Sequence, residues 1–157
     1  MTVVTSRAQK DIAWMRLALD EAEAAAKGGD VPIGAVIVRA GEVITRAANA
    51  TVASGDPTAH AELLAIQVAS AVLHDARLSG CTLYATLEPC AMCAGAIVLA
   101  RVDRVVFGAW DDKAGMAGSV GDVLRHARLN HRPEVQGGVM ADECAALLKE
   151  FFKERRI

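Results

Sequence analysis

The chain has 157 residues, 53% of them hydrophobic and 23% charged, and its formal net charge is -2. This balance excludes an intrinsically disordered chain, and the length favours one domain spanning residues 1–157. No apolar stretch reaches the roughly 20 residues of a membrane-spanning helix, and residues 1–7 lack the basic and apolar regions of a secretory signal, so we expect a cytoplasmic protein.

The first third of the chain predicts a helix followed by a hairpin. Residues 6–27 are rich in Ala, Leu and Glu, their apolar side chains recur at helical spacing, and Gly28 supplies a stop. Residues 33–38 form a short β-branched run, and residues 43–48 form a second strand-like run. The turn between them contains Gly41, so the two runs are typical of a β-hairpin.

The rest of the chain predicts alternating strands and helices. The expected elements are a loop at 50–57, a helix at 58–73 opened by Thr58 as its N-cap, a strand at 81–87, a helix at 91–100, a strand at 104–108, a loop at 110–119, a strand at 135–139 and a helix at 142–155. The hairpin requires one antiparallel pair, whereas strands separated by helices are expected to run parallel. This order predicts a three-layer α/β/α domain with a central mixed five-stranded sheet.

Two short segments carry the residues expected to do chemistry, Pro57-Thr58-Ala59-His60-Ala61-Glu62 and Glu88-Pro89-Cys90-Ala91-Met92-Cys93. Cys90 and Cys93 share one face of a helix, and without a secretory signal such a pair indicates a metal or redox site. His60 and Glu62 are two residues apart and can converge only at a helix start, which the preceding proline predicts. Helix N-termini carry partial positive charge, which lowers the pKa of a thiol and favours metal ligation.

The number of protein ligands distinguishes a catalytic zinc site from a structural one. Structural sites have four protein ligands, whereas catalytic sites have three and keep a water in the fourth position. His60, Cys90 and Cys93 supply three, and Glu62 remains beside them as a carboxylate that can move the protons of that water. Cys81 is expected in a strand and Cys144 on the core face of the last helix, so both are expected to be buried thiols. A fourth ligand from either cysteine would instead indicate a non-catalytic RNA-binding module with structural zinc.

The same residues carry a family resemblance. His-x-Glu followed by Pro-Cys-x-x-Cys is the signature of the zinc-dependent nucleobase deaminases. Segments on both sides of this signature make the sequence similar to bacterial tRNA-specific adenosine deaminases over nearly its whole length. They include Val31-Pro32-Ile33-Gly34-Ala35-Val36, Ala117-Gly118-Ser119, Asn130-His131-Arg132 and Ala141-Asp142-Glu143-Cys144.

The resemblance implies a homodimer of cytidine deaminase-like fold that converts the wobble adenosine of an arginine tRNA anticodon to inosine. It also implies that Glu62 transfers protons between a zinc-activated water and the base, that Asn49 contacts the base, and that Phe152 lies over the anticodon loop. Trp110 departs from the pattern, because close relatives carry a basic residue there, whereas Asp111 matches. The alternative is a free-base or nucleotide deaminase, for guanine or cytosine, with the same zinc site.

Overall fold

The structure is a computed structural model that describes residues 5–155. Residues 1–4, on which the expectation about a secretory signal partly rests, lie outside the described range. The first helix, α1 (Arg7–Lys27), begins with a capping box: the Ser6 side chain accepts from the Gln9 backbone, and the Gln9 side chain accepts from the Ser6 backbone. These reciprocal bonds satisfy two backbone donors that a helix start otherwise leaves unpaired.

The sheet has five strands in the order β2-β1-β3-β4-β5. Strands β1 (Gly34–Arg39) and β2 (Glu42–Ala48) form the predicted antiparallel hairpin. Strand β3 (Cys81–Leu87) lies antiparallel beside β1, while β4 (Arg104–Ala109) and β5 (Glu134–Gln136) continue the sheet in parallel. The predicted mixed five-stranded sheet is confirmed.

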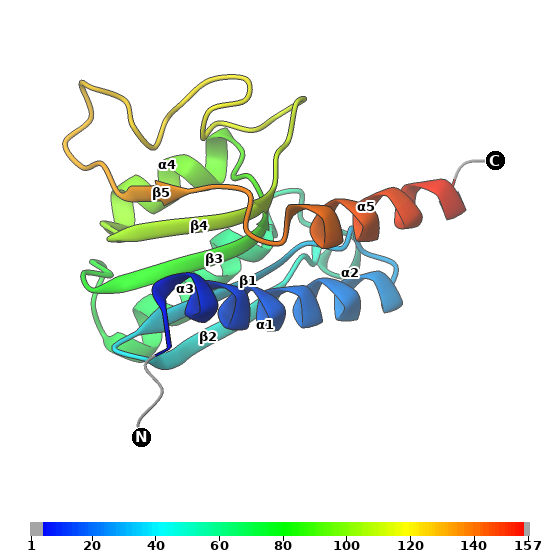
Figure 1. The fold of residues 1–157 in the computed structure, drawn as a ribbon, viewed down its shortest axis with the longest axis horizontal. Coiled ribbons are helices and arrows are strands. Elements are labelled where there is room, and N and C mark those ends of the chain that lie inside the picture. Colours follow the sequence, from blue (N-terminus) through cyan, green and yellow to red (C-terminus); the bar gives the residue numbers. More distant parts are fainter. Residues whose placement is uncertain (1–4, 156–157) are drawn as a thin grey trace.

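Helices cover both faces of this sheet (Figure 1). On one face, α1 and α5 (Ala141–Arg155) pack against strand residues such as Val36 and Val106. On the other face, α3 (Ala61–Leu73) and α4 (Ala91–Ala100) pack against residues such as Ile37 and Val105. Because neighbouring residues of a strand point to opposite faces, these strands are apolar on both sides, as buried strands require. The three-layer arrangement is also confirmed.

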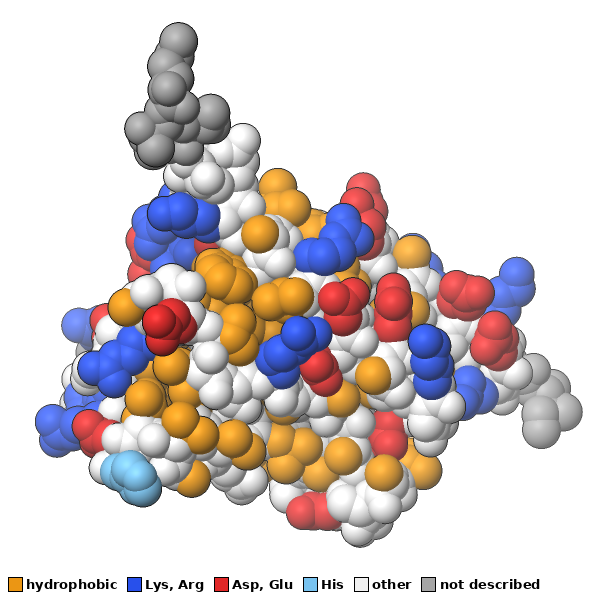
Figure 2. All heavy atoms as spheres, turned by 90° about the horizontal axis from the view of Figure 1, so that it is seen from below, with side chains coloured by type: hydrophobic (Ala, Val, Ile, Leu, Met, Phe, Trp, Pro, Cys, Tyr) orange, Lys and Arg blue, Asp and Glu red, His pale blue; other side chains and the backbone are white. Residues whose placement is uncertain are grey.

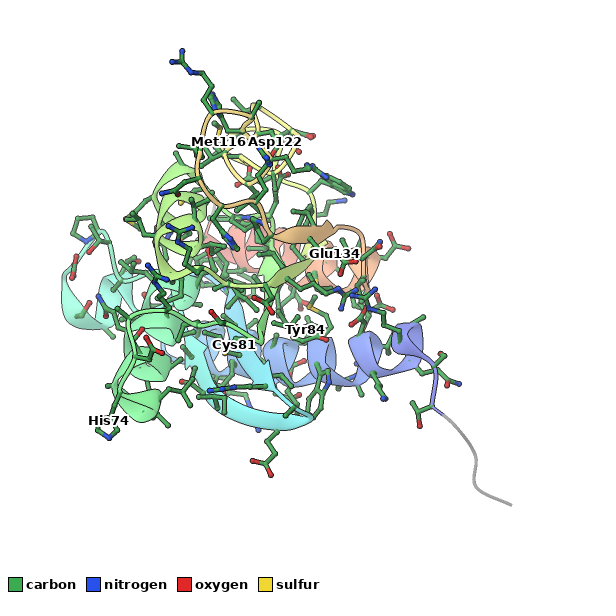
Figure 3. The ribbon with its side chains drawn as sticks, turned by 90° about the vertical axis from the view of Figure 1, so that its left-hand side faces the viewer. His74, Cys81, Tyr84, Met116, Asp122 and Glu134 are labelled. Atoms are coloured by element: carbon green, nitrogen blue, oxygen red, sulfur yellow. The ribbon has the colours of Figure 1, made fainter. Side chains whose placement is uncertain are left out.

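A buried ionic cluster holds α1 on the sheet. Asp11 accepts hydrogen bonds from Arg104 Nη1 and Nη2, both at 2.7 Å, and from the hydroxyl of Tyr84 at 2.8 Å. Arg104 Nε and Glu134 Oε2 lie 2.7 Å apart and form an ion pair, but the angle at the N–H group does not allow a hydrogen bond. Tyr84 on β3 and Glu134 on β5 lie near the start of α1 (Figure 3). Burial alone would raise the pKa of Asp11, but its bonds to Arg104 and Tyr84 and the nearby positive charge lower it below its ordinary value.

Two predicted boundaries around the first chemical segment are wrong. The loop expected at 50–57 contains a short helix, α2 (Thr51–Ser54), whose amides at 52 and 53 donate to the buried carboxylate of Asp30. Thr58 does not cap the following helix, because its amide and hydroxyl both donate to Asp56 within a turn. Helix α3 begins at Ala61, with His60 at the N-cap.

The last predicted strand is misplaced. Strand β5 covers Glu134–Gln136 rather than 135–139, because its first residue pairs with the first residue of β4. It ends before Gly137, where the chain passes so close to Phe107 and Trp110 that a Cβ would meet both rings. Gly138 then adopts a left-handed conformation with φ of 85°, so the chain is no longer extended and the strand cannot continue.

The described residues contain no helix with the length and apolar character needed to cross a membrane. On the side of the molecule drawn in Figure 2, the exposed hydrophobic side chains lie among charged ones.

Candidate metal centre

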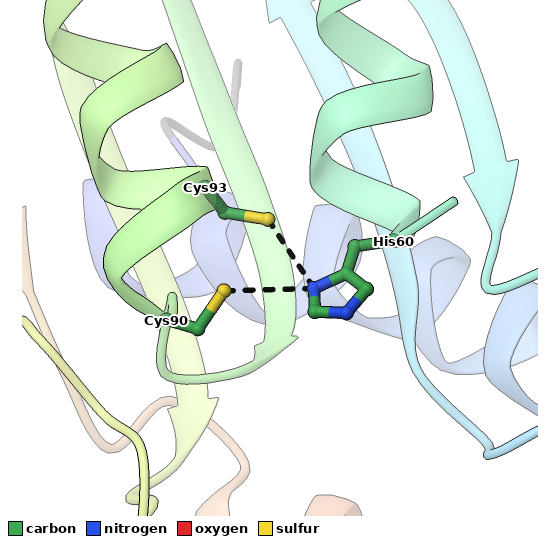
Figure 4. Close-up of side chains that lie close together, drawn as sticks. All are labelled: His60, Cys90 and Cys93. Atoms are coloured by element: carbon green, nitrogen blue, oxygen red, sulfur yellow. Dashed lines mark hydrogen bonds between the residues drawn. The ribbon is translucent and has the colours of Figure 1, made fainter. Parts of the chain in front are cut away.

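Three of the predicted ligands converge at the start of two helices. His60 is the N-cap of α3, Cys90 is the N-cap of α4, and Cys93 lies in the first turn of α4. Both sulfur atoms lie 3.5 Å from His60 Nδ1, as Figure 4 shows. The ligand atoms of all three residues lie within 4.8 Å of one another. The two segments, 30 residues apart in the chain, therefore present one set of donors.

The spacing of these donors fits a zinc ion. With zinc bonds of about 2.3 Å to sulfur and about 2.0 Å to nitrogen, tetrahedral coordination separates the two ligand atoms by about 3.5 Å. The two nitrogen–sulfur distances of 3.5 Å agree with this value. One imidazole and two thiols are also the donor types that zinc prefers.

The electrostatics of the site favour one thiolate. A hydrogen bond from Cys93, together with the nearby His60, lowers the pKa of Cys90 to about 5 against the opposing effect of burial. The same bond and burial raise the pKa of Cys93. The lowered pKa favours the thiolate form of Cys90, with Cys93 as donor and the amide end of α4 nearby.

A buried carboxylate adjoins the three donors. Glu62 lies in the first turn of α3 and is 4% exposed. Burial raises its pKa, while Cys93 and His60 act in the opposite direction. Among the described residues, its Oε1 atom has no hydrogen-bond partner. Since buried polar atoms are nearly always paired, this oxygen is an acceptor left free for a ligand.

The remaining cysteines lie elsewhere. Cys81 is buried in β3, and Cys144 is buried in α5 on the opposite face of the sheet, as expected for inert thiols. Within residues 5–155, the potential metal-binding group consists of His60, Cys90 and Cys93. The chain thus supplies three donors here, which is the number typical of a catalytic zinc site.

Asn49 and Phe152 lie outside this cluster. Asn49 follows β2 and is buried, with Nδ2 placed 3.4 Å from the Thr51 hydroxyl. The next amide, of Ala50, donates to the carbonyl of Ala59, which ties this segment to the one that carries His60. Phe152 on α5 is 47% exposed and faces a groove that Trp110, itself 52% exposed, also lines.

Sequence reasoning assigned no role to Glu88, although it belongs to the second chemical segment. Its carboxylate is 2% exposed and accepts four hydrogen bonds from the loop after β4. Burial would raise the pKa of Glu88, but these bonds lower it below its ordinary value. The available signal was its position: a glutamate between a buried strand and Pro89 needs donors from another segment.

The fold and this centre define a deaminase. A sequence model of the family described as MafB19-like deaminase matches residues 9–156, and the chain belongs to this family. Within it, the chain is 49% identical to the tRNA-specific adenosine deaminase of Bacillus subtilis (strain 168) over 147 residues, which cover 94% of this chain and 91% of the relative. The resemblance to bacterial tRNA-specific adenosine deaminases is thereby confirmed.

Solved structures agree with this placement. A tRNA:A34 deaminase, described as editing the wobble position of transfer RNA, matches with a TM-score of 0.84 and 44% identity over 87% of this chain and 99% of the other. A guanine deaminase from Nitrosomonas europaea matches with a TM-score of 0.76 and 26% identity over 96% and 86%. The expected cytidine deaminase-like fold is confirmed.

Proposed function

We propose that this protein hydrolyses adenosine to inosine at the wobble position of a tRNA anticodon, that of an arginine tRNA, with zinc as its cofactor. The observation that carries the proposal is the set of three donors beside a buried carboxylate with a free oxygen. The relatives named as tRNA-specific adenosine deaminases support adenosine in tRNA as the substrate.

His60, Cys90 and Cys93 would hold the zinc ion, as their types and 3.5 Å spacing support. Such an ion supplies one chemical effect, which is to bring the pKa of a coordinated water down towards neutrality. The Cys90 thiolate is favoured before metal binding, whereas Cys93 would release its proton when the ion binds.

Glu62 is the proton carrier. In the overall reaction, water adds its oxygen to C6 of adenine, the C6–N6 bond breaks, and ammonia leaves. Glu62 accepts one proton from the water and delivers it to N1 of the ring, then takes the remaining proton from the new C6 hydroxyl and gives it to the departing amino group, which leaves as ammonia. Its burial and its raised pKa suit a group that must both accept and return a proton.

Asn49 and Phe152 would bind the RNA. Asn49 is buried in a segment hydrogen-bonded to the one before His60, where a side-chain amide suits the edge of a flipped-out base. Phe152 is exposed on α5, where an aromatic ring suits an unpaired base of the anticodon loop.

The protein would act as a cytoplasmic homodimer. The side chain of Leu99 on α4 is 82% exposed, and Val68 and Val72 on α3 are about half exposed, at 48% and 54%. Apolar side chains of this size on two neighbouring helices suit an interface with a second copy.

The test is incubation of the purified zinc-loaded protein with adenosine-34 tRNA, followed by mass spectrometry of the nucleosides. We expect inosine at the wobble position and none with the Glu62→Ala variant. Guanine and cytosine are offered in parallel, because the guanine deaminase shares this fold. Xanthine or uracil formation with unmodified tRNA would overturn the proposal in favour of a free-base deaminase.

A further inference from the structure

Glu88 joins two segments that are remote in the chain. It lies between Leu87, the last residue of β3, and Pro89-Cys90, where α4 begins. Its Oε1 accepts from the Asp111 amide at 3.0 Å and from the Ser119 hydroxyl. Its Oε2 accepts from the amides of Ala117 at 2.9 Å and Ser119 at 3.0 Å. All four donors belong to residues 110–119, which we call the 110s loop.

The backbone reinforces this connection on both sides of the carboxylate. The Glu88 amide donates to the carbonyl of Ala109 at 2.9 Å, and the Met116 amide donates to the carbonyl of Pro89 at 2.8 Å. The 110s loop is therefore fastened to the turn that leads directly into Cys90.

Gly115 shows how closely the loop passes over this side chain. A Cβ at this position would overlap the carboxylate of Glu88. Only a residue without a side chain permits this approach. Since the carboxylate is enclosed by donors, it has no solvent into which it can move away.

The outer side of the loop forms part of the groove that contains Phe152. Trp110 and Lys113 line this groove together with Leu148 and Lys149 of α5, and the acidic residues Asp111 and Asp112 line it as well. An aromatic ring beside basic side chains suits unpaired nucleotides. Their bases can stack on the ring, and their phosphates can form ion pairs with the basic side chains. One carboxylate thus links the wall of the groove to the turn that carries Cys90.

We propose that Glu88 is a positioning residue, whose carboxylate fixes the 110s loop relative to the Cys90 turn so that RNA in the groove presents its base to the reaction centre. This inference rests on the proposed function for the identity of the substrate. The link between Glu88 and the loop depends on geometry alone, so it can be tested without any substrate.

The experiment uses zinc-loaded protein carrying Glu88→Gln. An amide nitrogen cannot accept from the backbone amides that face it, so one side of the carboxylate loses its bonds. We expect hydrogen–deuterium exchange of the 110s loop to accelerate by about tenfold or more, as the loss of a bond to a charged group implies. We also expect KM for tRNA to rise by about tenfold, with a smaller change in kcat and with zinc content unchanged.

Two further variants separate positioning from general stability. Gly115→Ala forces the loop and the carboxylate apart without altering the carboxylate, and it is expected to reproduce both effects. Asp11→Asn disrupts the buried ionic cluster beneath α1 instead. It is expected to lower the melting temperature while leaving loop exchange at low temperature and KM unchanged.

The outcomes distinguish the two proposals. Unchanged exchange of the 110s loop in both Glu88→Gln and Gly115→Ala would overturn the positioning role. Faster exchange with an unchanged KM would overturn its link to the substrate. Wild-type protein that leaves tRNA unmodified would overturn the proposed function, while the exchange measurement would still decide whether Glu88 holds the loop.

Discussion

Two buried clusters of polar side chains differ in how completely the hydrogen bonds of their carboxylates are satisfied. Beneath α1, the Asp11 carboxylate uses both oxygens, and Arg104 and Tyr84 supply the donors. At the starts of α3 and α4, Glu62 keeps one oxygen without a partner among the described residues, beside three donors suited to a metal. A carboxylate with both oxygens hydrogen-bonded stabilises the fold, whereas one with a free oxygen retains bonding capacity for a ligand. The comparison predicts that substitutions in the first cluster reduce stability and that those in the second reduce activity.

The largest effect is expected from Glu62→Gln. This change keeps the shape of the side chain and removes its ability to carry a proton, so kcat should fall by about a thousandfold or more. Zinc content, measured by atomic emission, should remain at one ion per chain. Normal turnover in a zinc-loaded Glu62→Gln protein would contradict the role of this residue.

Removal of a metal ligand comes next. Cys90→Ser should lose bound zinc, and with it about 4 kcal/mol of the stability that the metal-loaded protein has at a thousandfold excess of zinc over its Kd. Thermal unfolding with and without a chelator measures this difference. The matched variants Cys81→Ser and Cys144→Ser should keep zinc, and loss of metal from either would indicate a fourth protein ligand.

Substitutions in the ionic cluster beneath α1 should reduce stability and leave activity and zinc binding unchanged. Asp11→Asn removes the buried charged partner of Arg104 and leaves its guanidinium paired with the half-exposed Glu134 alone, which costs about 3 kcal/mol of stability, while kcat and zinc content stay unchanged. Chemical denaturation measures the loss. The control is Glu134→Gln, which breaks ion pairs of a half-exposed carboxylate and should cost less than about 1 kcal/mol.

The Asp11→Asn variant should also show a defined dependence of stability on pH. The pKa of Asp11 is lowered in the folded protein from its ordinary value of 3.8. The stability that it contributes is therefore fully present above pH 3.8 and is lost as the pH falls through the lowered pKa. The difference in unfolding free energy between wild type and Asp11→Asn should be constant near neutral pH and shrink below pH 3.8. A difference that grows on acidification would contradict this sign.

The smallest effects are expected in the groove. Phe152→Ala and Trp110→Ala should each raise KM for tRNA by about tenfold, in line with the loss of one base–aromatic stacking contact. Neither should change kcat or zinc content. Ile12→Ala on α1, which also alters a half-exposed hydrophobic side chain, is the control and should leave KM unchanged.

Local signals in the sequence were sufficient for the layered fold and for the meeting of His60 with Cys90 and Cys93. The capping residues of α1 lie three positions apart in the chain, and the members of each chemical segment are similarly close. Placing both segments at helix starts allowed their donors to meet at one site. These features were predictable because each depends on residues close in sequence.

The features that were missed depend on contacts between distant residues. The short helix α2 is stabilised by Asp30, which lies about 20 residues earlier and has no recognisable spacing to it. Strand β5 begins where β4 offers partners, and not where its own β-branched residues begin. Glu88 stood in a recognised motif, but its four bonds come from a loop more than 20 residues away. Tertiary contacts of this kind leave no periodic trace in a single sequence.

The most direct test of the candidate metal centre is X-ray absorption spectroscopy at the zinc edge of the purified protein. We predict two sulfur ligands at about 2.3 Å and two lighter ligands, nitrogen and oxygen, at about 2.0 Å. The oxygen ligand would be the water that Glu62 adjoins. A shell with three or four sulfur atoms, or a protein that is fully active without zinc, would contradict the account.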